Sequence, residues 1–408
     1  MKQGNESSVA RKVRKRWFTC TPVEFDGGAD FFSRDSGLMC RGFQMLGMES
    51  RAVMPGVRKP GDEDELTRTE YANLESPGWW GSLDLDGVVL YAWGSPEFRH
   101  VAAAIHNAGI RLVLNQDNGG LVSPTLGPLA WLKEQWVLSG AGRMRGGRWR
   151  FLLLAAKGLS KGLFWDDPLR IRHLRMGDVI ACVTPIAAEN YRRYCRIRAG
   201  IDLSERVRVI PHPVDTRFCL TGPKRRQVVT VGRWDDLRQK RPDLLMEVIG
   251  RLLERDPDVE VEIIGGGEER LQQWHGRLSQ KQRSRVRLRG RMQPGDMVAV
   301  YAASQVSYCP SAFESFHIAS GEALCCGCSV VAARSPSLAA FPWFEEEEGG
   351  TLSAKDDTAG HVDAICIELQ HWQAGERNAT AIAELWQSRL HADKVAGAVI
   401  KHFGVDLS

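Results

Sequence analysis

Short apolar runs alternate with helix-like stretches along the chain, and this alternation constrains the fold more than any other feature. Runs rich in Val, Ile and Leu are typical of strands buried on both faces, and the stretches between them are long enough for crossover helices. Strands joined in this way run parallel and form a doubly wound sheet. The sequence therefore predicts an α/β protein with strands at 17–20, 51–54, 88–93, 111–114, 179–183, 207–210, 228–231, 261–264, 286–289, 306–309 and 329–332.

The strand–helix series occurs twice, which predicts two domains. At roughly 150 residues per domain, a chain of 408 residues accommodates two or three. Pro211-His212-Pro213 forms a stiff turn between the two series, and we place the domain boundary there. We expect an N-terminal domain over 1–212, a C-terminal domain over 213–389 and a last helix, about 390–408, that packs back on the first domain. Such domains face each other across a ligand cleft.

Composition excludes several classes of protein. Apolar residues make up 43% and charged residues 25%, as in ordinary globular proteins, and no apolar run approaches the ~18 residues of a membrane span. The net charge of +4 is too small to indicate nucleic acid as a partner. The polar, basic start predicts no secretory signal, and the ten scattered cysteines are typical of buried thiols in a reducing compartment. We expect a cytoplasmic protein.

Two cations follow the strand expected at 228–231. Gly232 and Arg233 come directly after it, and Lys240 lies seven residues beyond Arg233. Loops at the carboxyl edge of a parallel sheet face its ligand crevice, where Arg and Lys bind phosphate oxygens. The pattern indicates a phosphate site, and ordinary surface charges are the alternative.

Three glycines, Gly265 to Gly267, end the strand expected at 261–264. Glycine lets a ligand or a neighbouring backbone approach closely. The spacing does not fit the GxGxxG dinucleotide fingerprint, because position 270 is Arg. A simple tight turn is the alternative to a ligand contact.

Two carboxylates, Glu314 and Glu322, are separated by seven residues. We expect a strand to end near Pro310 and a helix to begin near Phe316, so that its free N–H groups form an anion site. One carboxylate could then hold sugar hydroxyls and the other a ribose, with a diphosphate between them. Two unrelated surface carboxylates are the alternative.

The order of these motifs resembles the GT-B glycosyltransferases of family 4, which are retaining enzymes that use nucleotide sugars. The resemblance implies two facing Rossmann-like domains. It implies that Arg233 and Lys240 bind the donor diphosphate, that Glu314 contacts the donor sugar and that Glu322 binds the ribose. Further donor-binding residues that it implies are Gly28, Gly232, Gly266, Arg291, Met292, Phe316, His317 and Ile318.

The sequence departs from this family at three loops. Many members carry a histidine after the strand equivalent to 111–114, where this chain has Asp117. Asp117 could serve as the catalytic residue there or be an ordinary loop carboxylate. His317 replaces a small residue of the phosphate loop, and the loop after Ala333 lacks the usual glycine pair. At the interdomain hinge, His212 is interpreted as a turn residue.

The resemblance implies transfer of a hexosyl group, with retention and without a metal or other cofactor. The donor would be a nucleotide diphosphate sugar, and the acceptor a hydroxyl of a glycan or a lipid-linked glycoconjugate. Two alternatives stay open: a non-catalytic nucleotide-sugar-binding protein, and a dehydrogenase or epimerase. The missing GxGxxG argues against the last.

The segment 141–175 breaks the pattern, because it carries nine Lys and Arg residues interleaved with Trp, Phe and Leu. It is interpreted as an element that contacts an anionic membrane at the inner face of the cell, as the wall of a site for an acidic acceptor, or as a plain surface excursion. The basic residues of 11–16 would act with it. The acidic run Glu345–Glu348 is expected to be a solvated loop.

Overall fold

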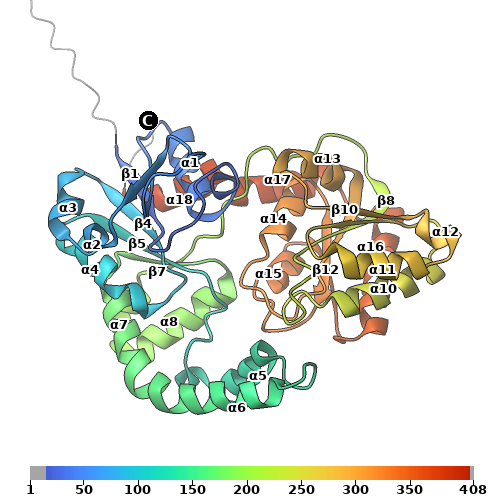
Figure 1. The fold of residues 1–408 in the computed structure, drawn as a ribbon, viewed down its shortest axis with the longest axis horizontal. Helices are drawn as coiled ribbons and strands as arrows, with labels where there is room; N and C mark the ends of the chain where they lie inside the picture. The colour runs from blue at the N-terminus through green and yellow to red at the C-terminus, as the bar shows by residue number, and fades with distance from the viewer. Residues whose placement is uncertain (1–14, 405–408) are drawn as a thin grey trace, which may run out of the picture.

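The structure is a computed structural model that describes residues 15–404 (Figure 1). Within this range the chain forms two fully parallel sheets, which confirms the predicted fold class. The first has seven strands in the order β3-β2-β1-β4-β5-β6-β7, and the second six in the order β10-β9-β8-β11-β12-β13. The strands are β1 Trp17–Cys20, β2 Ala52–Pro55, β3 Leu66–Thr69, β4 Gly87–Tyr91, β5 Arg111–Gln116, β6 Val179–Cys182, β7 Val207–Val209, β8 Arg225–Val231, β9 Glu260–Ile264, β10 Val286–Gly290, β11 Ser304–Tyr308, β12 Ser329–Ala333 and β13 Gly350–Ser353.

Helices join successive strands and most of them pack on the sheets, whereas the helices of residues 128–157 project away from the first sheet (Figure 1). In the N-terminal half they are α1 Asp35–Met45, α2 Tyr71–Leu74, α3 Pro77–Ser82, α4 Arg99–Asn107, α5 Pro128–Ser139, α6 Gly147–Lys157, the π-helix η4 Gly158–Asp166, α7 Asp167–Met176, α8 Pro185–Ala199 and α9 Ile201–Ser204. In the C-terminal half they are α10 Pro242–Arg255, α11 Glu268–Arg277, α12 Gln280–Arg283, α13 Pro294–Ala303, α14 Ile318–Cys325, α15 Phe341–Glu346, α16 Thr358–Gln373, α17 Ala379–Leu390 and α18 Ala392–Lys401.

Every strand expected from the sequence is present, with ends shifted by at most a few residues. The two strands that were not expected, β3 and β13, each lie at an edge of their sheet. Their sequences, LTRT and GTLS, carry little apolar signal. Pairing with β2 and β12 makes them strands, and this pairing is not visible in local sequence.

The prediction of a solvated loop at Glu345–Glu348 is wrong for its first half. Glu345 and Glu346 are the last residues of α15, which Phe341 and Phe344 anchor in the core. Arg334 donates to both carboxylate oxygens of Glu345, one at 2.6 Å. The charge pattern correctly predicted that Glu346 and Glu348 are exposed. The buried Phe341 and Phe344, however, make the first part of this run helical.

The chain crosses between the two halves twice, at adjacent positions. In the connector after β7, the N–H of Val214 donates to the carbonyl of Leu390 at 2.7 Å. The N–H of Ala392 returns a bond to the carbonyl of Val214 at 3.0 Å. Helix α18 then packs on α1 of the first half and buries Val399 and Ile400. Each such burial stabilises the fold by about 1.5–3 kcal/mol.

Both sheets reverse their strand order at a central strand, where doubly wound folds bind their ligands. In the first sheet β1 lies between β2 and β4, and in the second β8 lies between β9 and β11. The loops that follow β4, β5, β8 and β11 contain Trp93, Asp117, Lys240 and Glu314.

The contact between α1 and α18 leaves no room for a side chain at Gly42. A Cβ atom there would lie 2.3 Å from the carbonyl oxygen of Ala392. We expect Gly42→Ala to lower the free energy of unfolding by about 1–3 kcal/mol, measured by urea denaturation. Gly397 in α18 has open space around its Cβ position, so Gly397→Ala is expected to raise stability by about 0.5–1 kcal/mol. Equal effects of the two substitutions would contradict this packing.

Candidate functional site

A buried ion pair joins the loop after β8 to the loop after β11. The Lys240 Nζ atom lies 2.5 Å from Glu314 Oε1, and the two side chains are 11% and 9% exposed. Burial raises the pKa of Glu314, but the neighbouring His317 and Lys240 outweigh it and hold that pKa below its ordinary value. Arg233 is not part of this pair, because its side chain is 70% exposed and lies 3.8 Å from Asp236.

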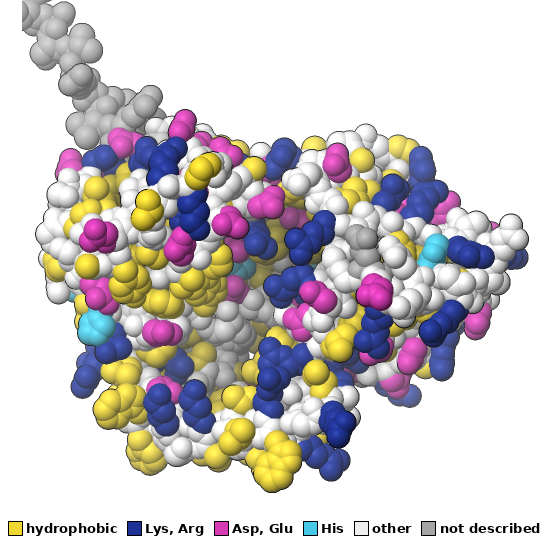
Figure 2. Space-filling model, viewed as in Figure 1, with side chains coloured by type: hydrophobic (Ala, Val, Ile, Leu, Met, Phe, Trp, Pro, Cys, Tyr) yellow, Lys and Arg dark blue, Asp and Glu magenta, His cyan; other side chains and the backbone are white. Residues whose placement is uncertain are grey.

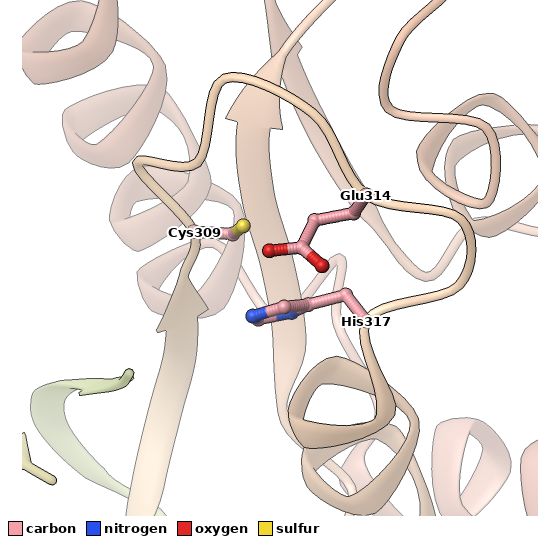
Figure 3. A group of neighbouring side chains, drawn as sticks. All are labelled: Cys309, Glu314 and His317. Atoms are coloured by element: carbon pink, nitrogen blue, oxygen red, sulfur yellow. The ribbon is translucent and has the colours of Figure 1, made fainter. Parts of the chain in front are cut away.

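Glu314 also belongs to a buried cluster with Cys309 and His317 (Figure 3). Their ligand atoms lie within 4.8 Å of one another and point toward a common centre (Figure 3). Thiol, carboxylate and imidazole form a donor set that suits a divalent transition metal. The Lys240 ammonium, however, already supplies positive charge at this carboxylate. The negative charge of Glu314 in this cluster is therefore balanced by Lys240 of the same chain.

His317 precedes α14 and holds its first turn. Its backbone is left-handed, with φ at 66°, and its Nδ1 atom lies 2.7 Å from Ser320 Oγ. Burial and the nearby Lys240 lower the pKa of His317 to about 4, so the ring is neutral at neutral pH. Ile318, the first residue of α14, follows directly, and free N–H groups at the start of a helix attract anions. The helix begins two residues later than the predicted Phe316.

Glu322 lies one turn further along α14. The Tyr301 hydroxyl donates to Glu322 Oε2 at 3.2 Å. Burial raises the pKa of Glu322 to about 8, although the hydrogen bond from Tyr301 opposes this. The two predicted carboxylates thus differ: Glu314 is held ionised by a cation, and Glu322 is bonded to a hydroxyl.

The glycine turns after β8 and β9 pack against each other. Gly265 has φ at 123°, and a Cβ there would lie 1.8 Å from the carbonyl oxygen of Gly232. Gly266 faces Arg291, whose Nε atom would lie 3.3 Å from its Cβ position. Met292 follows Arg291 and packs against the core of the C-terminal half. The structure therefore places Gly232 against Gly265, and Gly266 beside the side chain of Arg291.

Gly28 lies apart from these residues, in the loop after β1. Its carbonyl accepts from the N–H of Phe31 at 3.0 Å, and its Cβ position faces Gly61. The contacts of Gly28 lie within the N-terminal half, whereas the other predicted donor-binding residues lie in the C-terminal half.

His212 connects both halves, and its interpretation as a turn residue alone is incomplete. Its Nε2 atom lies 3.0 Å from Asp117 and its Nδ1 atom 3.4 Å from Asp35. Its ring packs edge-on against Phe316 at 5.8 Å between centroids. Burial lowers the pKa of His212, but Asp117 and Asp35 outweigh this and raise it to about 9. His212 is therefore protonated at neutral pH.

Asp117 also bridges the two halves, because it accepts a hydrogen bond from the hydroxyl of Ser315. Burial raises its pKa, but His212 and Ser315 together hold the pKa of Asp117 below its ordinary value. The sequence left Asp117 as a catalytic candidate or an ordinary loop carboxylate, and it did not predict these partners. A histidine between two prolines at a domain boundary was the signal that could have indicated them.

Asp117, Glu314 and Ser315 border a cleft of about 540 Å³ between the two halves. Figure 2 shows it as a hollow with charged side chains on its walls. Asp117, Glu134 and Arg170 line it from the N-terminal half, and Gln239, Glu314 and Ser315 from the C-terminal half. Glu134 was not among the predicted residues, since it lies in α5 outside any motif.

Comparisons with known proteins agree with this geometry. Residues 225–371 match the family model described as Glycosyl transferases group 1. The chain is also 35% identical over 130 residues to D-inositol 3-phosphate glycosyltransferase of Corynebacterium diphtheriae, a match that covers 30% of this chain and 30% of that relative.

Solved structures with the same fold span nearly the whole chain. Anabaena Alr3699/HepE in complex with UDP matches with a TM-score of 0.63 and 15% identity, over 96% of this chain and 99% of that one. Sucrose-phosphate synthase from Thermosynechococcus elongatus matches with a TM-score of 0.60 and 14% identity, over 96% and 98%. The chain therefore has the GT-B fold, and residues 225–371 of its C-terminal half are similar to the group 1 glycosyl transferases.

The His212–Asp117 pair predicts a pH-dependent stability. The pKa of His212 is about 9 in the folded protein and about 6.5 in the unfolded chain. The pair therefore contributes its full stabilisation of the folded state below pH 6.5, and this contribution is lost as the pH rises through 9. We expect the difference in unfolding free energy between wild type and His212→Gln to shrink by up to about 3 kcal/mol over this window. Urea denaturation at several pH values measures it, and a difference independent of pH would contradict the ion pair.

Proposed function

We propose that this protein is a retaining glycosyltransferase that transfers a hexosyl group from a nucleotide diphosphate sugar to an acceptor hydroxyl. The observation that carries the proposal is the Lys240–Glu314 pair beside the first turn of α14, at the cleft between the halves. The matched family model and the solved relative bound to UDP-glucose support this class of donor.

In this proposal the diphosphate leaves while positive charge builds on the sugar ring. Lys240 and the free N–H groups at the start of α14 stabilise the developing charge on the leaving phosphate, and exposed Arg233 folds over it. The acceptor oxygen bonds to the anomeric carbon on the face from which the phosphate departs. The hydroxyl proton goes to the departing phosphate oxygen. Throughout the reaction Glu314 contacts the donor sugar, and Glu322 accepts a hydrogen bond from a ribose hydroxyl.

Asp117 acts here as a fixed negative charge. Because His212 and Ser315 keep it ionised, it is a weak base, but it can orient the acceptor hydroxyl and stabilise the positively charged sugar ring. The proposal includes no metal ion, since Lys240 and the N–H groups of α14 carry the leaving-group charge.

Substitution of Lys240 tests the proposal. We expect Lys240→Ala to lower the release of nucleoside diphosphate from UDP-glucose or GDP-mannose by about 100-fold or more, because a preorganised charge on the leaving group is lost. Lys281→Ala, in the exposed helix α12, is the matched control. The assay contains EDTA, and NMR of the product identifies its anomer.

Near-normal turnover of Lys240→Ala would contradict the assignment, and so would an inverted product or loss of activity in EDTA. Nucleotide-sugar binding by the wild type without any turnover would favour the non-catalytic alternative.

We further propose that the surface formed by α5, α6 and η4, which we call the apolar–basic surface, contacts an anionic membrane. The contact would be at the cytoplasmic face of that membrane. Within it Trp149 is 73%, Leu153 71% and Phe164 80% exposed. These exposed apolar side chains argue against the alternative that segment 141–175 is a surface excursion whose apolar residues pack on the domain. Exposed Arg148 and Arg150 flank Trp149, and Figure 2 shows apolar and basic side chains together along this edge. None of the helices within residues 15–404 combines the length and hydropathy of a membrane span, so the contact would be peripheral.

Flotation with phosphatidylglycerol vesicles tests this surface. We expect the wild type to float at low salt and to dissociate at high salt, since basic residues attract the anionic surface. The combined variant Trp149→Ser, Phe164→Ser and Trp165→Ser is expected to lose flotation at least tenfold. Val57→Ser, which removes an 81% exposed apolar residue elsewhere, is the control. Flotation unchanged in the combined variant would contradict the proposal.

A further inference from the structure

Three side chains that can bind a metal ion meet at the carboxyl edge of the second sheet (Figure 3). Cys309 follows the end of β11, Glu314 lies in the loop after it, and His317 precedes α14. All three residues are buried, and one ligand atom of each lies within 4.8 Å of the others. One continuous segment, 309–317, thus brings a thiol, a carboxylate and an imidazole to the same point.

The ring of His317 is held in the way that suits a metal ligand. It packs on Phe341 with 5.8 Å between the ring centroids, and its Nδ1 atom lies 2.7 Å from Ser320 Oγ. A histidine that binds a metal through one ring nitrogen usually forms a hydrogen bond through the other. The Ser320 contact therefore orients the ring and leaves Nε2 for an ion.

The other two donors are fixed through their backbones. The N–H of Cys309 donates to the carbonyl of Val331 at 2.8 Å, and the N–H of Glu314 donates to the carbonyl of Ser337 at 2.8 Å. Bonds of about 2.0–2.3 Å to one tetrahedral ion place its ligand atoms about 3.3–3.8 Å apart. The three side chains therefore need to close in by about 1 Å, a shift within reach of side-chain rotation.

Lys240 is the group with which such an ion competes. Its Nζ atom lies 2.5 Å from Glu314 Oε1 and balances the charge of that carboxylate. When Cys309 releases its thiol proton to solvent, the thiolate and the Glu314 carboxylate together offset a divalent ion. The Lys240 ammonium then has no counter-charge left in the cluster, and two cations repel each other strongly in a buried site.

We propose that Cys309, Glu314 and His317 bind a divalent transition-metal ion of the zinc type, in competition with Lys240. The ion enters from the cleft, because Glu314 lines it. Thiolate and imidazole ligands favour such an ion over Mg²⁺ and Ca²⁺. Since the ion takes Glu314 away from Lys240, it also blocks the donor site reversibly. This last consequence rests on the proposed function, whereas the metal site itself does not.

Titration of the whole, reduced protein with Zn²⁺ against a chromophoric chelator tests the site without nucleotide. We expect Cys309→Ser and His317→Asn each to weaken Zn²⁺ binding at least tenfold, and asparagine tolerates the left-handed backbone at 317. Cys219→Ser, which removes a partly exposed thiol elsewhere, is the control. Co²⁺ in place of Zn²⁺ is expected to give the charge-transfer absorption of a cobalt–thiolate bond, which Cys309→Ser abolishes.

The competition with Lys240 gives a second, opposite prediction. We expect Lys240→Ala to tighten Zn²⁺ binding at least tenfold, because the competing ammonium is gone. Lys281→Ala, in the exposed helix α12, is expected to leave the affinity unchanged. The gain is expected to vanish when Cys309→Ser is added to Lys240→Ala, which separates this site from thiols elsewhere in the chain.

The inference is overturned if the wild type binds no Zn²⁺, if Cys309→Ser binds it as tightly, or if Lys240→Ala does not gain affinity. UDP titrations with and without Zn²⁺ test the block of the donor site. We expect Zn²⁺ to lower the UDP affinity of the wild type at least tenfold more than that of Cys309→Ser, and an equal effect on both would contradict the block. Zn²⁺ binding without UDP or GDP binding would refute the donor assignment only.

Discussion

The adjacent double crossing between the halves is the constraint on which the rest of the structure depends. Val214 exchanges backbone hydrogen bonds with the junction of α17 and α18, so the connector and the returning helix hold each other in register. The loops of both sheets then reach one cleft, and Ser315 and Ser337 meet Asp117 and Glu134 across it.

Two carboxylates that burial would neutralise are each kept ionised by a cation from a distant segment. Lys240 does this for Glu314, and His212 does it for Asp117. Removing one member of such a pair leaves an uncompensated buried charge, which costs about 3–5 kcal/mol. Glu134 and Glu322 are bonded to hydroxyls instead, and burial raises the pKa of each.

The sequence predicted the buried parts of the fold well, because parallel strands and their helices repeat a strong apolar signal. In α10, for example, Leu245, Val248, Ile249 and Leu252 recur at helical spacing, and all four are buried. The edge strands β3 and β13 were missed, since pairing and not composition defines them. Lys240 and Glu314 were predictable because each follows a strand end at a switch point. Glu134 and the partners of His212 were not, because their roles arise from contacts between segments far apart in the chain.

The central claim is that the C-terminal half binds a nucleoside diphosphate through Lys240 and the first turn of α14 without a metal ion. Calorimetric titration of the whole protein with UDP, GDP and NAD in the presence of EDTA tests it most directly. The account predicts that UDP or GDP binds and that NAD does not. Failure of both diphosphates to bind, or binding of NAD in their place, would contradict it.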